Sequence, residues 1–317
     1  MKLEDIQRVA IIGTGTMGAG IAQCFAQAGL AVHVIDQSQE ILDHCLSRIA
    51  DSLKLFVEFG LLQESPALIQ TRIKPFLSRD MGRAIKDCAF IIESIPEILE
   101  LKKELLLKLD SCDPGIILSS NTSTFTVSSL TEGMRTARRV VGTHFFFPPQ
   151  IIPLVEIHRG QATVEESIET TRKLMLRIGK KPILVRKEIL GFVVNRLQAA
   201  IGREANCLLE QGVVTPEDFD LAARASYGFR LANVGPLAQA DMNGLDTKMR
   251  SDELTYKELC SSTELSRAFV EKVKRGETGL KAGKGFYDYR GKSAERIINE
   301  MERNLLKQLV LFKQREG

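Results

Sequence analysis

The sequence predicts an α/β protein in two parts: a doubly wound parallel sheet over residues 1–188 and an all-α domain over residues 189–317. Up to about residue 187, short apolar runs of strand length alternate with longer segments of helical spacing, which is typical of a parallel sheet covered by helices. Beyond that point every periodic segment has helical spacing. A chain of 317 residues, 44% of them hydrophobic, is long enough for two domains.

The individual elements follow from the same patterns. Buried parallel strands read as short apolar runs, and we expect them at residues 8–12, 31–35, 90–95, 115–121, 139–145, 154–157 and 182–185. Helices with one apolar face are expected at residues 16–29, 39–60 and 99–109. The second part contains four further helical segments, and the last one, from residue 293, carries an apolar stripe that should dock on another surface.

Composition excludes several classes of protein. The net charge is +3 with both signs mixed along the chain, which does not indicate a nucleic-acid partner or a membrane surface. No apolar run reaches about eighteen residues, and the acidic start MKLEDIQ does not resemble a signal peptide. The six cysteines form no C-x-x-C pair, so we expect free thiols in a reducing cytoplasm and no bound metal.

A glycine-rich turn between the first strand and the first helix predicts a dinucleotide site of the Rossmann type. The spacing G-x-G-x-x-G would permit a tight turn, a close approach of pyrophosphate and close helix–strand packing. Asp36 ends the second strand, where a carboxylate can accept hydrogen bonds from a ribose and would repel a 2′-phosphate, so NAD is expected rather than NADP. The alternative is a glycine corner without a ligand. The expected cradle comprises Gly13, Gly15, Thr16, Met17, Gly18 and Asp36.

One histidine of the four stands at a position suited to chemistry. His144 ends an apolar strand at the edge where open α/β sheets bind ligands. Glu156 lies in the apolar run PLVEI, where a carboxylate is costly unless it is paired, so a His–Glu pair would satisfy the acid and orient the ring. Spacing alone leaves this pairing open. We expect His33 and His44 to be structural or surface residues and His158 to be solvated.

Seven segments in order carry a family likeness. They are GTGTMGAGIAQ (13–23), IIESIPEILELKKELLLKLD (91–110), SSNTST (119–124), GTHFFFPPQIIPLVEI (142–157), GFVVNRL (191–197), GPLAQADMNGLD (235–246) and GKGFYDY (283–289). On these segments, which span nearly the whole chain, the protein resembles the L-3-hydroxyacyl-CoA dehydrogenases, the group that includes 3-hydroxybutyryl-CoA dehydrogenase. The resemblance implies NAD-dependent oxidation of a 3-hydroxyacyl-CoA in fatty acid metabolism by a homodimer.

The resemblance also implies roles for single residues. His144 would be the general base and Glu156 its orienting partner. Ser123 would hydrogen-bond the substrate hydroxyl or carbonyl, and Asn195 would complete the polar ring around the reacting carbon. The resemblance further places two residues on the nicotinamide side of the cofactor, Glu97 and Lys102. Simpler interpretations remain for three of them. Ser123 could cap a turn, Asn195 could be a helix-surface amide, and Lys102 could belong to a helical Glu–Lys pair.

Two departures from the family pattern bear on the substrate. Phe147 stands where the family usually has an asparagine. In the stretch SLKLFVEFGLLQE (52–64) after Asp36, where a lysine patch would receive CoA phosphates, only Lys54 is basic and Glu58 is acidic. The chain also resembles relatives that oxidise free 3-hydroxy acids, such as L-gulonate and carnitine dehydrogenases. For a free acid, Arg230 would be the carboxylate anchor, unless it forms a surface salt bridge. A non-catalytic NADH-binding or structural protein is a further alternative.

Overall fold

The computed structural model describes residues 3–112 and 115–316. It divides into two compact units. Unit 1 runs to Asn195 and takes up the chain again from Glu302, and unit 2 is Arg196–Met301. The helical part was expected over residues 189–317, whereas the second unit begins at Arg196 and ends at Met301. The last helix, α14 (Ala294–Glu316), returns to unit 1 because its Leu306 and Leu309 are buried with Phe56 and Ile151.

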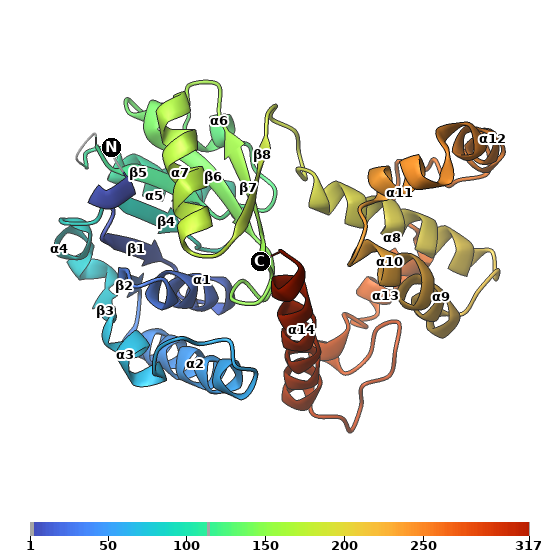
Figure 1. The fold of residues 1–317 in the computed structure, drawn as a ribbon, viewed down its shortest axis with the longest axis horizontal. Helices are drawn as coiled ribbons and strands as arrows, with labels where there is room; N and C mark the ends of the chain where they lie inside the picture. Colours follow the sequence, from blue (N-terminus) through green and yellow to red (C-terminus); the bar gives the residue numbers. More distant parts are fainter. Residues whose placement is uncertain (1–2, 113–114, 317) are drawn as a thin grey trace. The chain divides into compact units, whose positions relative to one another are not determined.

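Unit 1 is built on a single sheet (Figure 1). Within the described residues it has eight strands in the order β3-β2-β1-β4-β5-β6-β7-β8, and every neighbouring pair is parallel except β6 and β7. The doubly wound sheet is thus confirmed, with one antiparallel pair. The strands are β1 (Arg8–Ile12), β2 (Ala31–Asp36), β3 (Ile73–Leu77), β4 (Phe90–Glu93), β5 (Ile117–Ser120), β6 (Val140–Phe145), β7 (Leu154–Arg159) and β8 (Lys181–Val185).

Strand β3 was not expected from the sequence. Its residues IKPFL include a lysine and a proline and lack the continuous apolar run of a central strand. The strand lies at the edge of the sheet, where a proline can be tolerated because one side of the backbone has no partner.

Helices cover both faces of the sheet. Alternate residues of the strands enter two separate cores, as the two-residue period of a strand requires. One core packs under α1 (Thr16–Gln27), α2 (Gln39–Glu58), α3 (Pro66–Thr71) and α7 (Glu165–Arg177). The other packs under α4 (Met81–Ile85), α5 (Leu99–Leu109) and α6 (Val127–Leu130).

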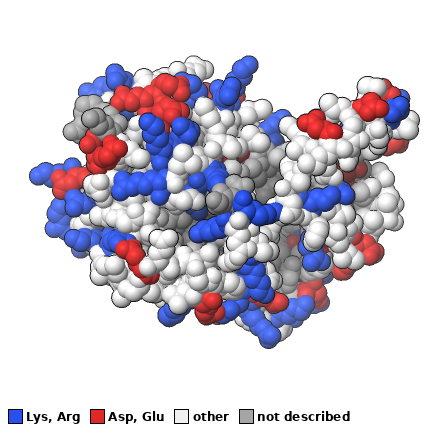
Figure 2. All heavy atoms as spheres, viewed as in Figure 1, with Lys and Arg blue, Asp and Glu red and all other residues white. Residues whose placement is uncertain are grey.

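Unit 2 is helical, as expected. Its helices are α8 (Val194–Glu210), whose first two residues belong to unit 1, α9 (Pro216–Ala222), α10 (Gly228–Leu231), α11 (Pro236–Asn243), α12 (Leu245–Thr255) and α13 (Arg267–Lys274). Acidic and basic side chains are interspersed with uncharged ones over the face shown in Figure 2. Among the described residues, no helix is both long and apolar enough to cross a membrane.

Candidate active site

The glycine turn after β1 is shaped by close backbone packing. Gly13 has a φ of 91°, and a Cβ atom there would lie 2.6 Å from the carbonyl oxygen of Ser94. A Cβ atom on Gly18 would lie 1.9 Å from the carbonyl oxygen of Gly13. Gly15 differs, because a Cβ atom there would lie within 4 Å of no atom of the residues that the structure describes. Packing inside the protein therefore explains why positions 13 and 18 require glycine. At Gly15 the missing side chain leaves space that a ligand can enter.

The first turn of α1 is a ready donor for a pyrophosphate. Its N-cap residue is Gly15, which supplies no side-chain hydrogen bond to the free amides of that turn. Unpaired amides and the helix dipole together favour an anion at this end. Thr16 and Met17 begin this turn, and the Thr16 hydroxyl accepts a hydrogen bond of 3.0 Å from Arg48.

Asp36 is held at the end of β2 beside this turn. Its Oδ2 accepts hydrogen bonds from the Thr14 amide at 2.6 Å and the Thr14 hydroxyl at 2.9 Å, and its Oδ1 accepts one from the Gln37 amide at 2.7 Å. A carboxylate can accept about four hydrogen bonds, so this one retains capacity for a ribose hydroxyl. The cradle fits the adenosine and pyrophosphate parts of NAD.

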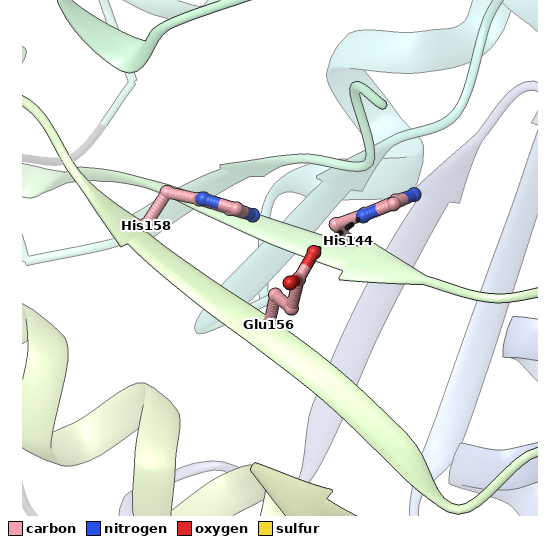
Figure 3. A group of neighbouring side chains, drawn as sticks. All are labelled: His144, Glu156 and His158. Carbon is pink, nitrogen blue, oxygen red and sulfur yellow. Dashed lines mark hydrogen bonds and ion pairs between the residues drawn. The ribbon is translucent and has the colours of Figure 1, made fainter. Parts of the chain in front are cut away.

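His144 and Glu156 form the expected pair. They face each other across the antiparallel strands β6 and β7, and both side chains are buried. Nδ1 of His144 lies 2.9 Å from Oε2 of Glu156 (Figure 3). An ionised carboxylate can only accept, so the ring carries its proton on Nδ1 and leaves the lone pair of Nε2 free. This arrangement suits a general base.

Glu156 is also fixed from its other side. Its Oε1 accepts hydrogen bonds of 3.0 Å from the amides of Val193 and Val194, where α8 begins. Burial alone would raise the pKa of Glu156, but the hydrogen bonds from His144 and the Val194 amide outweigh burial and hold this pKa below its usual value. The acid therefore stays ionised near neutral pH and can stabilise a positive imidazolium.

Ser123 and Asn195 lie together at the start of α8. The side-chain amide of Asn195 donates to the backbone carbonyl of Ser123 at 3.0 Å. The Ser123 amide donates to Oε1 of Glu97 at 2.9 Å. Asn195 directly follows Val194, whose amide binds Glu156, so the same turn of α8 contacts both parts of the expected site. Their contact with a substrate stays a prediction.

Lys102 and Glu97 belong to a buried ionic network. The Lys102 ammonium lies 2.6 Å from Glu93, 3.2 Å from Glu97 and 3.1 Å from the carbonyl oxygen of Ile95. These three acceptors match its three protons, so its direct contact with a cofactor stays a prediction, whereas the Glu97 carboxylate remains one-third exposed. Glu93 was not predicted from the sequence. The feature that could have indicated it is its position as an acid at the end of the apolar strand β4.

Arg230 and Phe147 are both exposed. Arg230 lies in α10 of unit 2, and its use as a carboxylate anchor stays a prediction. The Phe147 side chain is 48% exposed.

The expectation that His158 is solvated is wrong. His158 is only 4% exposed, and its ring packs against Phe192 with centroids 3.6 Å apart and ring planes tilted by 39°. It lies two residues after Glu156 in β7, so both side chains point to the same face of the strand. Burial lowers the pKa of His158 from 6.5 to about 3. The two-residue spacing between Glu156 and His158 in a strand was the sequence feature that could have indicated the burial of His158.

Phe192 completes an aromatic wall around His144. Its centroid lies 5.6 Å from the His144 ring, and that of Phe146 lies 4.3 Å away. Phe192 has a φ of 50°, a left-handed conformation that is strained for a bulky residue and is often found at functional sites. The apolar rings exclude water from one side of the imidazole.

Acid should destabilise the fold through His158. Its folded pKa is about 3 and its unfolded pKa about 6.5, so the unfolded state binds more protons between these values. Stability present above pH 6.5 is therefore lost as the pH falls, by about 2 kcal/mol between pH 7 and pH 5. Denaturant unfolding at both pH values should show this loss in the wild type and not in His158→Leu. Equal losses in the two proteins would contradict the assignment.

Comparison with known proteins identifies the family of both parts of the chain. The profile of the 3-hydroxyacyl-CoA dehydrogenase NAD-binding domain matches residues 8–189, and that of the C-terminal domain of the same enzymes matches residues 191–289. A Bacillus subtilis protein described as a probable 3-hydroxybutyryl-CoA dehydrogenase is 33% identical to this chain over 296 residues. The match covers 92% of this chain and 100% of that protein. The human lambda-crystallin homolog is 35% identical over 84% of this chain and 85% of its own.

A pyridine-derivative dehydrogenase is also similar. The 5-formyl-3-hydroxy-2-methylpyridine 4-carboxylate 5-dehydrogenase of Mesorhizobium japonicum is 30% identical over 95% of this chain and 96% of its own. A crystal structure of an enzyme of that activity, described as an NAD⁺-dependent dismutase, superposes with a TM-score of 0.90 at 29% identity, covering 97% of this chain and 99% of the other. With both domain profiles matched in order, this chain belongs to the 3-hydroxyacyl-CoA dehydrogenase family of NAD-dependent oxidoreductases.

Proposed function

We propose that this protein oxidises an L-3-hydroxyacyl-CoA, such as 3-hydroxybutyryl-CoA, to the 3-oxoacyl-CoA in cytoplasmic fatty acid metabolism. The observation that carries the proposal is the buried His144–Glu156 pair, held at 2.9 Å beside the carboxyl ends of the parallel strands. Ligands bind at this edge of open α/β sheets. The glycine cradle and Asp36 lie at the same edge, after β1 and at the end of β2.

The protein's part in the reaction is the handling of one proton. NAD, when bound, supplies the acceptor for the hydride that leaves carbon 3. Nε2 of His144 takes the hydroxyl proton, and the imidazolium that forms is stabilised by the Glu156 carboxylate. In the reverse direction the imidazolium returns the proton to the carbonyl oxygen. One imidazole is sufficient for both directions.

Neighbouring side chains would place the substrate. The side-chain amide of Asn195 donates to the backbone carbonyl of Ser123 at 3.0 Å, which holds the two residues together. The Ser123 hydroxyl and the Asn195 side chain would both hydrogen-bond the oxygen on carbon 3. Phe146 and Phe192 keep water away from the imidazole, which strengthens its interaction with Glu156.

His144→Gln should lower kcat by about 10²–10⁴-fold, because glutamine cannot accept the hydroxyl proton. NADH binding, followed by the fluorescence of the bound cofactor, should remain nearly intact because the glycine cradle is unchanged. The matched control is His44→Gln, which removes an exposed imidazole and should keep wild-type turnover. Wild-type rates in His144→Gln would show that another group is the base.

A free 3-hydroxy acid is the second candidate substrate. The pyridine carboxylate dehydrogenase is similar over nearly the whole chain and acts on a free acid, by its name. Helix α2 also offers little to CoA phosphates, since Lys54 forms an ion pair of 2.7 Å with Asp51 and Arg48 donates to Thr16. Both basic residues of α2 are therefore engaged within the protein.

A paired assay should separate the two substrates. We expect NADH oxidation with acetoacetyl-CoA and little with free acetoacetate, and little NAD reduction with L-gulonate or L-carnitine. Turnover with a free acid alone would replace the acyl-CoA substrate. In that case Arg230→Ala should raise KM for the acid by about 10–100-fold, because the free energy of one charge-assisted hydrogen bond corresponds to a factor of that size.

We further propose that the protein is a homodimer. None of the helices α8–α13 contains a buried residue, although the structure describes all of unit 2. Large apolar side chains are instead exposed, among them Leu237 at 82% and Met242 at 74%. Exposed patches of this kind mark association surfaces.

Analytical ultracentrifugation should give twice the mass of the chain, and Leu237→Glu should weaken association. A monomer at micromolar concentration would contradict the proposal.

A further inference from the structure

A third buried ligating residue faces the catalytic pair. His144, Glu156 and His158 each offer one nitrogen or oxygen atom, and these atoms all lie within 4.8 Å of one another. Figure 3 shows the three side chains on the adjacent strands β6 and β7, with the His158 ring and the Glu156 carboxylate directed toward His144. All three residues are more than nine-tenths buried. The proposed reaction uses only two of them, so His158 has no part in it.

His158 lacks the hydrogen bonds that a buried imidazole normally makes. Neither of its ring nitrogens has a partner among the described residues. A buried polar atom without a partner is costly, and an ion that is not part of the structure is one established explanation. The ring is also closely packed, because Phe192 lies against it and a Cβ atom on Gly142 would lie 2.9 Å from its Cδ2.

Two imidazoles and one carboxylate form the donor set of an open zinc site. Zn²⁺ takes nitrogen and oxygen ligands in this combination and keeps a fourth position for water or substrate. We propose that His144, Glu156 and His158 bind Zn²⁺ and that the bound metal switches the dehydrogenase off. Bonds of about 2.0–2.2 Å require the side chains to draw together. The Glu156 carboxylate would exchange its hydrogen bond from His144 for a bond to the metal.

The inhibition follows from the tautomer of His144 and rests on its proposed role as the base. Nδ1 of His144 now carries the proton that Glu156 accepts. A metal on Nδ1 needs that lone pair, so the proton moves to Nε2 and the ring stays neutral. Nε2 then has no lone pair for the hydroxyl proton of the substrate. No electron is transferred, and the cradle at Asp36 is untouched, so NADH should still bind.

Metal binding can be measured without turnover. The full-length protein is stripped with a chelator and titrated with Co²⁺, whose visible absorption reports tetrahedral coordination, and Zn²⁺ is then used to displace it. The six cysteines are free, so thiolate charge-transfer bands must be followed in parallel. We expect one Co²⁺ per chain with visible bands and no thiolate bands.

The ligand variants decide where the metal binds. Outer-shell partners alone are worth about 10–100-fold in metal affinity, so the loss of a ligand in His158→Leu should weaken Co²⁺ and Zn²⁺ binding by about 100-fold or more. His44→Gln is the matched control, since His44 is exposed, and its affinity should equal that of the wild type. No Co²⁺ binding by the wild type, or equal affinity in His158→Leu, would overturn the metal site.

Inhibition is then compared with binding. Zn²⁺ should inhibit the wild type at the concentration that displaces Co²⁺, and a chelator should restore the rate. His158→Leu, measured against its own metal-free rate, should need about 100-fold more Zn²⁺. Binding at this site without inhibition would overturn the switch and His144 as the base together. Loss of turnover in His144→Gln without any metal binding by the wild type would overturn the metal proposal alone.

Discussion

The site depends on one buried carboxylate. Glu156 is fully buried, and such a charge is tolerated only where hydrogen bonds replace its water. His144 supplies one of these bonds from β6, and the amides of Val193 and Val194 supply two more from the start of α8. The same acid therefore orients the imidazole and anchors the first turn of α8, which carries Asn195. Removal of Glu156 would release both.

The antiparallel strand β7 makes this arrangement possible. The carboxyl ends of the parallel strands β1, β2, β4, β5 and β6 meet at one edge of the sheet, which places the cradle, Asp36 and His144 there. Because β7 runs in the opposite direction, its third residue pairs directly with His144 in β6. His158 follows on the same face, and with Glu156 and His144 it forms, within one pair of strands, the set of three residues proposed to bind Zn²⁺.

Much of the fold was predictable because its signals are local. The glycine spacing, the acid at the end of β2 and the apolar strands all act within a few residues of one another. The edge strand β3 was missed because its lysine and proline remove the apolar pattern. His158 was assigned to solvent because its neighbours in sequence are polar, whereas its burial is set by Phe192, a residue 34 positions away.

The sequence by itself determined the α/β class, the helical second part and the preference for NAD, and it pointed to His144 as the proposed base, because each depends on residue type and short-range spacing. Tertiary structure decided the rest. It joined Glu156 to His144 through strand register, placed Asn195 against Ser123, and enclosed Lys102 between Glu93 and Glu97. It also returned the end of α14 to unit 1 through Leu306 and Leu309. These contacts join residues far apart in the chain, and only packing brings such residues together.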